Sequence, residues 1–367
     1  MPCIHMITSP SDHLIQILHP KEAGSERLLT RPFCTLIILV TTVIALAMTV
    51  VTTSATTLVN GSGATFPAPL YQRWAADFHQ EHPDIVVNYQ GVGSGAGVSD
   101  FIRGLTDFCA SDVAVKDEEI ARLHGNVLMI PVTAGTIVLS YNIPGITQLK
   151  LNRDAYVGIF LGKITQWNDP AIAKSNPGIT FPDLPITVVT RSDGSGTTAL
   201  FTGHLMTISS EFSDKVGFGK SVKWPTGLSG KGNDGVTALI KRTRGSIGYM
   251  EFGFAQSTHL PMAELENKAG AFVAPSDATG SLTLATIVLP ENLRDFSFDP
   301  IGQGTYPITG FTWLLLKKEY PAEKSAAIKA FVTYALTKGQ VVAPQLGYLS
   351  LPSPVVEKAQ KALNGVK

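Results

Sequence analysis

The chain has 367 residues, a length that suggests two domains, and 44% of its residues are hydrophobic, which is enough to bury a sizeable core. Lys and Arg together number 29, and so do Asp and Glu, so the formal net charge is zero. This balance argues against a nucleic-acid partner, which calls for a basic excess. It does not argue against anion binding, because backbone N–H groups and a single Arg can hold an anion.

The first 55 residues are predicted to be a signal peptide or membrane-targeting leader. Three basic residues, the last of them Arg31, precede an uncharged and largely apolar stretch at 32–53, and Ala55 ends a run of small residues suited to cleavage. We expect export to the periplasm with cleavage after Ala55; an uncleaved membrane anchor is the alternative, because the apolar stretch is long enough to span a bilayer. Of three cysteines, Cys109 alone would remain, as a small buried side chain.

The elements expected directly after the leader are a helix, a strand and a second helix. Pro69 stands in the first turn of a helix whose buried stripe has the spacing i, i+4, i+8: Leu70, Trp74 and Phe78. The apolar, β-branched run at 85–89 predicts a strand. A glycine-rich loop at 91–97 follows, and then the spacing i, i+3, i+4, i+7 predicts an amphipathic helix through Val98, Phe101, Ile102 and Leu105.

The second half of the chain repeats this alternation. Strands are expected at 137–141 and 186–190, and the second of them runs directly into a polar loop and a helix that buries Leu200, Phe201 and Leu205. A buried strand at 311–316 and helices around 326–336 and 355–363 complete the chain. The pattern predicts an α/β fold with mostly parallel strands and helices on both faces.

Two loops of this α/β pattern share one design, because each follows a strand, contains Gly-Ser-Gly and leads into a helix. The Gly-Ser-Gly triplets are at 93–95 and 194–196. Glycines let the backbone approach a ligand closely, and the first N–H groups of a helix have no partner within the helix. Together with the helix dipole, these groups form an anion site without a charged side chain.

Side chains next to the two loops would strengthen such an anion site. Ser94, Ser195 and Thr197 offer hydroxyl donors. Arg191, at the end of its strand, can make a charge-assisted contact, and Asp193 can orient it. We expect Arg191 to be the only cation near the site.

Asp112 is the unexpected residue, because a carboxylate repels anions unless the anion carries a proton. Monohydrogen phosphate has a proton to donate, whereas sulfate at neutral pH has none, so a buried acceptor would select protonated oxyanions. The alternative is that Asp112 caps a helix around 117–123.

A series of motifs then brings a family resemblance into view. The chain resembles the phosphate-binding subunit of the bacterial high-affinity phosphate ABC transporter, in the family's order and from about Gly61 to about Leu363. The motifs are GATFPAP (63–69), YQGVGSG (89–95), FCASD (108–112), RSDGSGT (191–197), VKWP (222–225), GKGNDG (230–235), GSIGY (245–249) and YPIT (306–309).

The resemblance implies a two-lobed periplasmic-binding-protein (Venus flytrap) fold, with each lobe a mixed sheet flanked by helices. Lobe I would comprise 56–131 and 305–367 and lobe II 132–304, with phosphate clamped in the cleft between them. The chain would be a monomer without catalytic residues, metal or cofactor, and it would deliver phosphate to membrane permease subunits.

The resemblance also implies a role for each matching residue. Thr65 would give its hydroxyl and Phe66 its backbone N–H, Ser94 would donate from the first loop, and Asp112 would accept the proton of the ligand. Arg191, steadied by Asp193, would pair with the anion. The other side would be closed by Ser195, Gly196 and Thr197.

Three other protein classes remain as alternatives. The spacing Gly91-x-Gly93-x-x-Ala96, with Asp112 downstream, is that of a dinucleotide-binding enzyme. A serine hydrolase fits less well, since Asp193 rather than Gly stands two residues before Ser195. A phosphatase would also bind phosphate, but the sequence has no evident nucleophile or metal cluster for it.

Overall fold

The computed structural model describes residues 56–367, so the predicted leader and its cleavage site at Ala55 lie outside the described residues. Within 56–367, eight strands form one curled sheet in the order β2-β1-β3-β11-β4-β8-β6-β7, and β10-β9-β5 form a smaller one. The strands are β1 (Thr57–Gly63), β2 (Ile85–Gly91), β3 (Phe108–Ser111), β4 (Leu128–Asn142), β5 (Lys150–Leu151), β6 (Thr187–Arg191), β7 (Leu228–Gly230), β8 (Ser246–Glu251), β9 (Glu264–Glu266), β10 (Phe272–Val273) and β11 (Thr309–Leu316).

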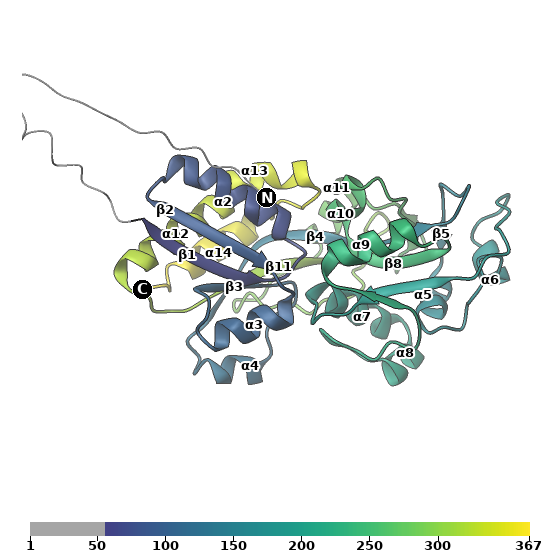
Figure 1. Ribbon diagram of the computed structural model, residues 1–367, viewed down its shortest axis with the longest axis horizontal. Helices are drawn as coiled ribbons and strands as arrows, with labels where there is room; N and C mark the ends of the chain where they lie inside the picture. The colour runs from purple at the N-terminus through teal and green to yellow at the C-terminus, as the bar shows by residue number, and fades with distance from the viewer. Residues whose placement is uncertain (1–55) are drawn as a thin grey trace, which may run out of the picture. The chain divides into compact units, whose positions relative to one another are not determined.

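Helices pack on this sheet along its whole length (Figure 1). They are α2 (Ala68–Glu81), α3 (Ser94–Ile102), α4 (Asp117–Arg122), α5 (Arg153–Phe160), α6 (Pro170–Ala173), α7 (Gly196–Ile208), α8 (Ser210–Lys215), α9 (Gly232–Arg242), α10 (Phe252–Ser257), α11 (Asp277–Ala285), α12 (Ala322–Leu336), α13 (Lys338–Val342), the 3-10 helix η1 (Ala343–Leu346) and α14 (Ser353–Leu363). None of them combines the length and the apolar character that a bilayer-spanning helix needs.

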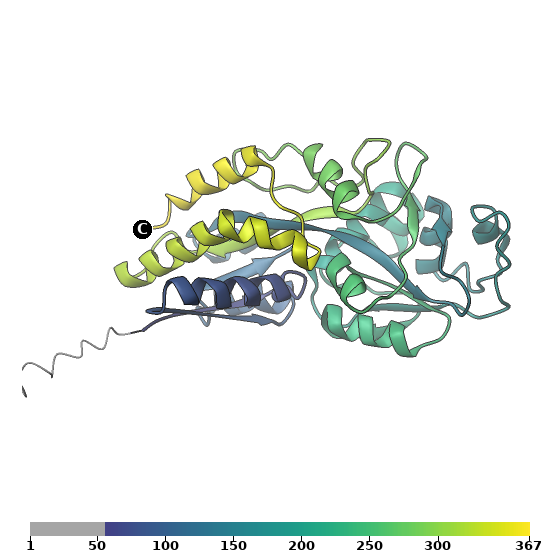
Figure 2. The same cartoon turned by 90° about the horizontal axis from the view of Figure 1, so that it is seen from above.

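The large sheet is mixed, and its pairing explains the two-lobed fold. Strands β2, β1 and β3 are parallel in one lobe, and β8, β6 and β7 are parallel in the other. Between them β4 and β11 run antiparallel to their neighbours. Strand β4 pairs with β11 over 128–136 and with β8 over 137–142, so it belongs to both lobes (Figures 1 and 2).

The predicted helix–strand–helix unit is confirmed, with one correction. Helix α2 buries Leu70, Trp74 and Phe78, and β2 follows it. Helix α3, however, ends at Ile102, and Leu105 lies beyond it with 63% of its surface exposed. The reason is Gly104, whose φ of +73° is incompatible with a continuing right-handed helix.

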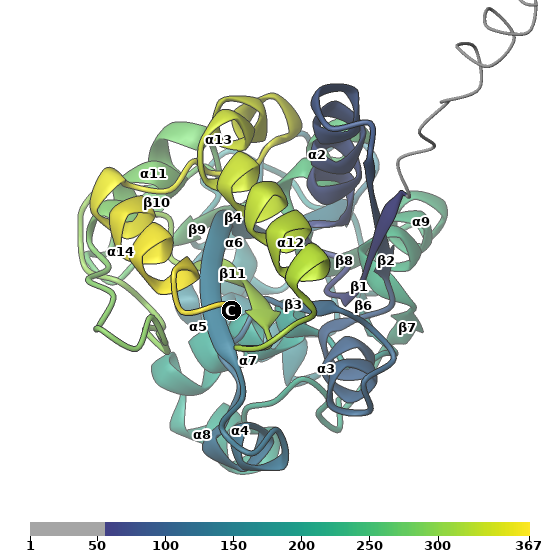
Figure 3. The ribbon, with the colours of Figure 1, turned by 90° about the vertical axis from the view of Figure 1, so that its left-hand side faces the viewer.

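The later elements also match their predictions, although β4 is much longer than the strand expected at 137–141. Helices cover both faces of the β2-β1-β3 region, since α2 and α12 lie on one face and α3 on the other (Figure 3). Cys109 is fully buried in β3 as predicted, and burial raises the pKa of its thiol.

The segment 286–304, which the resemblance assigns to lobe II, bonds to elements near the end of the chain. The Leu293 carbonyl accepts a hydrogen bond from Nε1 of Trp313 in β11 (2.8 Å), and the Leu289 carbonyl accepts one from Nζ of Lys358 in α14 (2.7 Å). Part of the segment 286–304 is therefore tied to the elements that close the chain.

Candidate functional site

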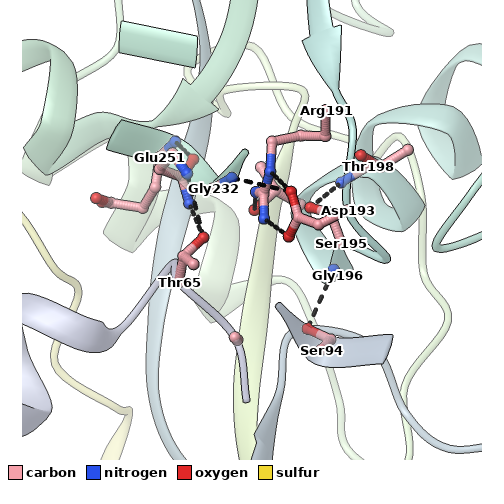
Figure 4. Close-up of polar contacts among 12 residues, drawn as sticks. Thr65, Ser94, Arg191, Asp193, Ser195, Gly196, Thr198, Gly232 and Glu251 are labelled. Atoms are coloured by element: carbon pink, nitrogen blue, oxygen red, sulfur yellow. Dashed lines mark hydrogen bonds and ion pairs between the residues drawn. The ribbon is translucent and has the colours of Figure 1, made fainter. Parts of the chain in front are cut away.

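The site lies where the carboxyl ends of the parallel strands of both lobes face each other. Thr65 follows β1 and Ser94 begins α3 after β2, while Arg191 ends β6 and Gly232 begins α9 after β7. Figure 4 shows Thr65 and Ser94 on one side, reaching toward residues of the other lobe. Carboxyl ends of parallel strands are the usual binding edge of α/β sheets, so the topology alone points to this edge.

The first Gly/Ser loop approaches the opposite lobe through glycine. Gly93 precedes α3 with φ of +94° and no side-chain cap. A Cβ at Gly93 would lie 2.3 Å from Asp193 Oδ2, so a larger residue would force the two loops apart. Its neighbour Gly95 donates its N–H to the Gly194 carbonyl at 2.7 Å. The two predicted loops are therefore in direct contact.

The second loop holds a cation and a capped helix. Strand β6 ends at Arg191, whose Nε and Nη2 donate to Asp193 Oδ1 (2.8 Å) and Oδ2 (2.5 Å). Burial opposes ionisation of Asp193, but the hydrogen bonds and charge of Arg191 prevail and lower the pKa of Asp193. Arg191 Nη1 reaches Thr197 Oγ1 at 3.4 Å, and Ser195 Oγ accepts from Thr198 N–H at 3.1 Å as the N-cap of α7. The guanidinium is thus held rigidly at the start of a helix.

Asp112 follows β3 directly and is almost completely buried, with 1% of its surface exposed. Its Oδ1 accepts a hydrogen bond from Thr312 Oγ1 at 2.7 Å. Burial raises the pKa of Asp112 to about 7, although the Thr312 hydrogen bond and the charge of Arg191 work in the opposite direction. The alternative role as a helix cap is wrong, because Lys116 is the N-cap of α4.

Gly196 brings the second loop against Asp112 and the first loop. Its N–H donates to Ser94 Oγ at 3.1 Å. A Cβ added to Gly196 would lie 2.6 Å from Ser94 Oγ and 2.7 Å from Asp112 Oδ2. Residues from the two loops and from β3 therefore meet within a few ångströms of one another.

Thr65 and Phe66 stand between β1 and α2. Thr65 Oγ1 accepts from the backbone N–H (3.2 Å) and from Nδ2 (3.0 Å) of Asn233 in the other lobe. Phe66 is fully buried, and its carbonyl accepts from the Tyr348 hydroxyl at 2.7 Å. The structure thus gathers the predicted site residues at one junction, with Phe66 packed behind it.

Three residues at this junction were missed by the sequence reasoning, namely Asn233, Thr312 and Lys220. Only Asn233 had a signal, since it lies inside the glycine-rich motif at 230–235. The expectation that Arg191 is the only nearby cation is wrong. Lys220 Nζ bonds to Glu119 Oε1 at 2.9 Å, and the Lys220 carbonyl accepts from Ser195 N–H at 2.8 Å. The charge of Lys220 also lowers the pKa of Asp112, against the larger effect of burial.

The geometry weighs against two of the alternative classes. A dinucleotide needs an open loop after the first strand, but Gly93 and Gly95 are covered by Asp193 and Gly194. A hydrolase needs a serine bonded to a histidine, but among the described residues the partner of Ser195 Oγ is the Thr198 N–H, which it caps. Within the described part of the chain, no group of three or more His, Cys, Asp or Glu residues could hold a metal ion.

Comparisons with known proteins agree with this geometry. Residues 50–338 match the sequence profile described as a PBP superfamily domain. The chain is 42% identical over 341 residues to the phosphate-binding protein PstS of Methanocaldococcus jannaschii, covering 85% of this chain and 87% of that protein. It is 43% identical over 317 residues to the PstS of Pasteurella multocida, covering 84% and 90% respectively.

A solved structure extends the likeness to the fold. The phosphate-binding protein of Stenotrophomonas maltophilia superposes with a TM-score of 0.67 at 21% identity, covering 83% of this chain and 93% of that one. At this identity the likeness concerns the fold alone, whereas the PstS relatives carry the family assignment. The chain therefore belongs to the PBP superfamily and, within it, to the PstS family of solute-binding proteins.

Proposed function

We propose that the chain binds inorganic phosphate between its two lobes and delivers it to an ABC permease. The observation that carries this proposal is the meeting of Asp112, Arg191 and the two Gly/Ser loops at one buried junction. The relatives at 42% and 43% identity are named phosphate-binding proteins, which supports the same ligand.

Each group at the junction would meet a different need of the anion. Arg191 would supply the charge, and the hydroxyls of Ser195 and Thr197, with the Thr197 N–H, would supply directed donors at the start of α7. The Gly196 N–H would join them by turning from Ser94 Oγ to the anion. Thr65, Phe66 and Ser94 would complete the shell from the first lobe. Asp112 would accept a hydrogen bond from the proton of the ligand. Sulfate has no proton at neutral pH, so it would be repelled by the Asp112 carboxylate.

The proposal includes the setting in which the chain works. It would act in the periplasm as a monomer without enzymatic activity, with permease subunits as its partners. Lobe I would comprise 56–131 and 305–367, and lobe II 132–304, closing by hinge bending around the ligand. Crossings near 131–133 and 300–306 would join the lobes.

A calorimetric panel of phosphate, sulfate and molybdate on the mature chain tests the proposal. We expect saturable binding of phosphate and much weaker binding of the other two anions. Release of phosphate from a model ester, measured in parallel, would instead indicate a phosphatase. Absence of phosphate binding would refute the proposed function.

A further inference from the structure

Asn233 bonds to both lobes at the junction, and the sequence analysis gave it no role. It lies in the first turn of α9 and is fully buried. Its Oδ1 accepts from the backbone N–H of Glu251 at 3.1 Å, while its own N–H and Nδ2 both point at Thr65 Oγ1. Figure 4 shows Thr65 and Glu251 on either side of this contact.

The orientation of the Asn233 amide follows from its partners. The backbone N–H of Glu251 can only donate, so the atom that faces it must be the amide oxygen. The amide nitrogen then faces Thr65, and it can only donate. Burial of Asn233 excludes water as a competing partner. The direction of the Asn233–Thr65 hydrogen bond is therefore determined.

This direction leaves the Thr65 hydroxyl able only to donate one further hydrogen bond. A hydroxyl has two lone pairs and one proton, and Asn233 supplies two donors at 3.2 and 3.0 Å, one for each lone pair. The Thr65 proton must then point at an acceptor elsewhere. The neighbouring site, with Asp112, Arg191 and both Gly/Ser loops, is where the proposed anion would offer that acceptor.

We propose that Asn233 is a positioning residue that turns the Thr65 hydroxyl into an obligatory donor to the bound oxyanion. The inference rests on the proposed function and adds a second specificity element to it. Because Thr65 and Asn233 lie in opposite lobes, the donor is oriented only when the lobes meet. Ser94 Oγ also accepts across the junction, from Gly196 N–H, but this single donor occupies only one of its lone pairs.

A double-mutant cycle tests the inference through phosphate affinity measured by calorimetry. We expect Asn233→Ala to weaken phosphate binding about tenfold, as for loss of one oriented hydrogen bond. Thr65→Val, which removes the hydroxyl, should weaken it at least as much. In the Thr65→Val background, Asn233→Ala should then change the affinity less than about twofold.

The controls separate this role from a structural one. Asn176→Ala removes another buried amide, whose partners among residues 56–367 are Lys150 and Ile172. It should lower the melting temperature without changing phosphate affinity. If Asn233→Ala does not fold, Asn233→Asp takes its place in the cycle. Asp keeps an oxygen that accepts from the Glu251 N–H and puts a second oxygen where Nδ2 donates to Thr65. It should weaken binding more in the wild-type background than in the Thr65→Val background.

The possible outcomes are distinct. Losses that multiply in the double variant, or an unchanged affinity of Asn233→Ala, would overturn the role of Asn233 while leaving phosphate binding intact. A wild-type chain that binds no phosphate would overturn both this inference and the proposed function.

Discussion

The two Gly/Ser loops are similar in sequence, yet they contribute different things to the site. The first approaches the opposite lobe closely because Gly93 has no side chain, and for the same reason α3 has no side-chain cap. The second caps its helix with Ser195 and anchors a cation through the Arg191–Asp193 pair. One loop thus contributes close approach and the other contributes charge. Two loops of similar sequence that face each other therefore need not be interchangeable.

Removing the cation of the second loop should have the largest effect. Arg191→Ala should weaken phosphate binding about a thousandfold, because it deletes a buried charge and leaves Asp193 buried without its partner. Titration calorimetry measures the loss directly.

Lys220→Met is the matched control for that experiment. Lys220 is also a partly buried cation, but its Nζ bonds to Glu119 in α4, outside the two Gly/Ser loops, so we expect an affinity change of only a few-fold. Equal losses in the two variants would mean that net positive charge, and not the Arg191 geometry, holds the anion.

Adding a methyl group to each loop should have the next largest effect on phosphate affinity. The two variants should show which loop accommodates the added methyl group better. Gly196→Ala places a Cβ 2.6 Å from Ser94 Oγ, so phosphate affinity should fall by about a hundredfold. Gly95→Ala places its Cβ no closer than 3.1 Å to Gly194 Cα, so a loss of about tenfold or less is expected.

Binding kinetics provide the check on the two glycine variants. If the methyl groups act by hindering lobe closure, both should speed phosphate release, Gly196→Ala more than Gly95→Ala, with near-native association rates. Identical release rates would show that the loops tolerate added bulk equally.

Asp112→Asn should have the smallest effect on binding and a clear effect on selectivity. With the repelling carboxylate gone, the ratio of phosphate to sulfate affinity should fall about tenfold. An unchanged ratio in competition calorimetry would contradict the proton-acceptor role.

The same Asp112 variant should also change how the free energy of unfolding depends on pH. The pKa of Asp112 is raised from 3.8 to about 7, so the folded ligand-free chain favours the protonated carboxyl. Its free energy of unfolding should therefore decrease as pH rises from about 4 to about 7, by up to about 4 kcal/mol. Asp112→Asn should flatten this dependence, as chemical denaturation at several pH values can show.

Sequence reasoning went furthest where the pattern was local. The stripe of Leu70, Trp74 and Phe78, the strand before the second Gly/Ser loop, and the glycine loops all depend on neighbours in the chain. The structure brings the predicted site residues to one junction, and their individual roles remain predictions.

Sequence reasoning failed where partners are far apart in the chain. Thr312 lies 200 residues from Asp112, and Asn233 lies 168 residues from Thr65. Lys220 is held by Glu119 of the other lobe and by the Ser195 backbone of its own lobe. No spacing rule connects such residues, since the sheet order that brings them together is a property of the folded chain.

Strand β4 carries its backbone hydrogen bonds through the point at which it changes partners, so no loose tether joins the two halves at this strand. If the two lobes open, β4 must then twist along its length, because it stays paired on both sides of that point. The ladder is least regular at the bulge between Thr312 and Trp313, beside the residue that bonds to Asp112. A twist of the β4–β11 pair would therefore move Thr312 and, through its hydrogen bond, the Asp112 carboxylate.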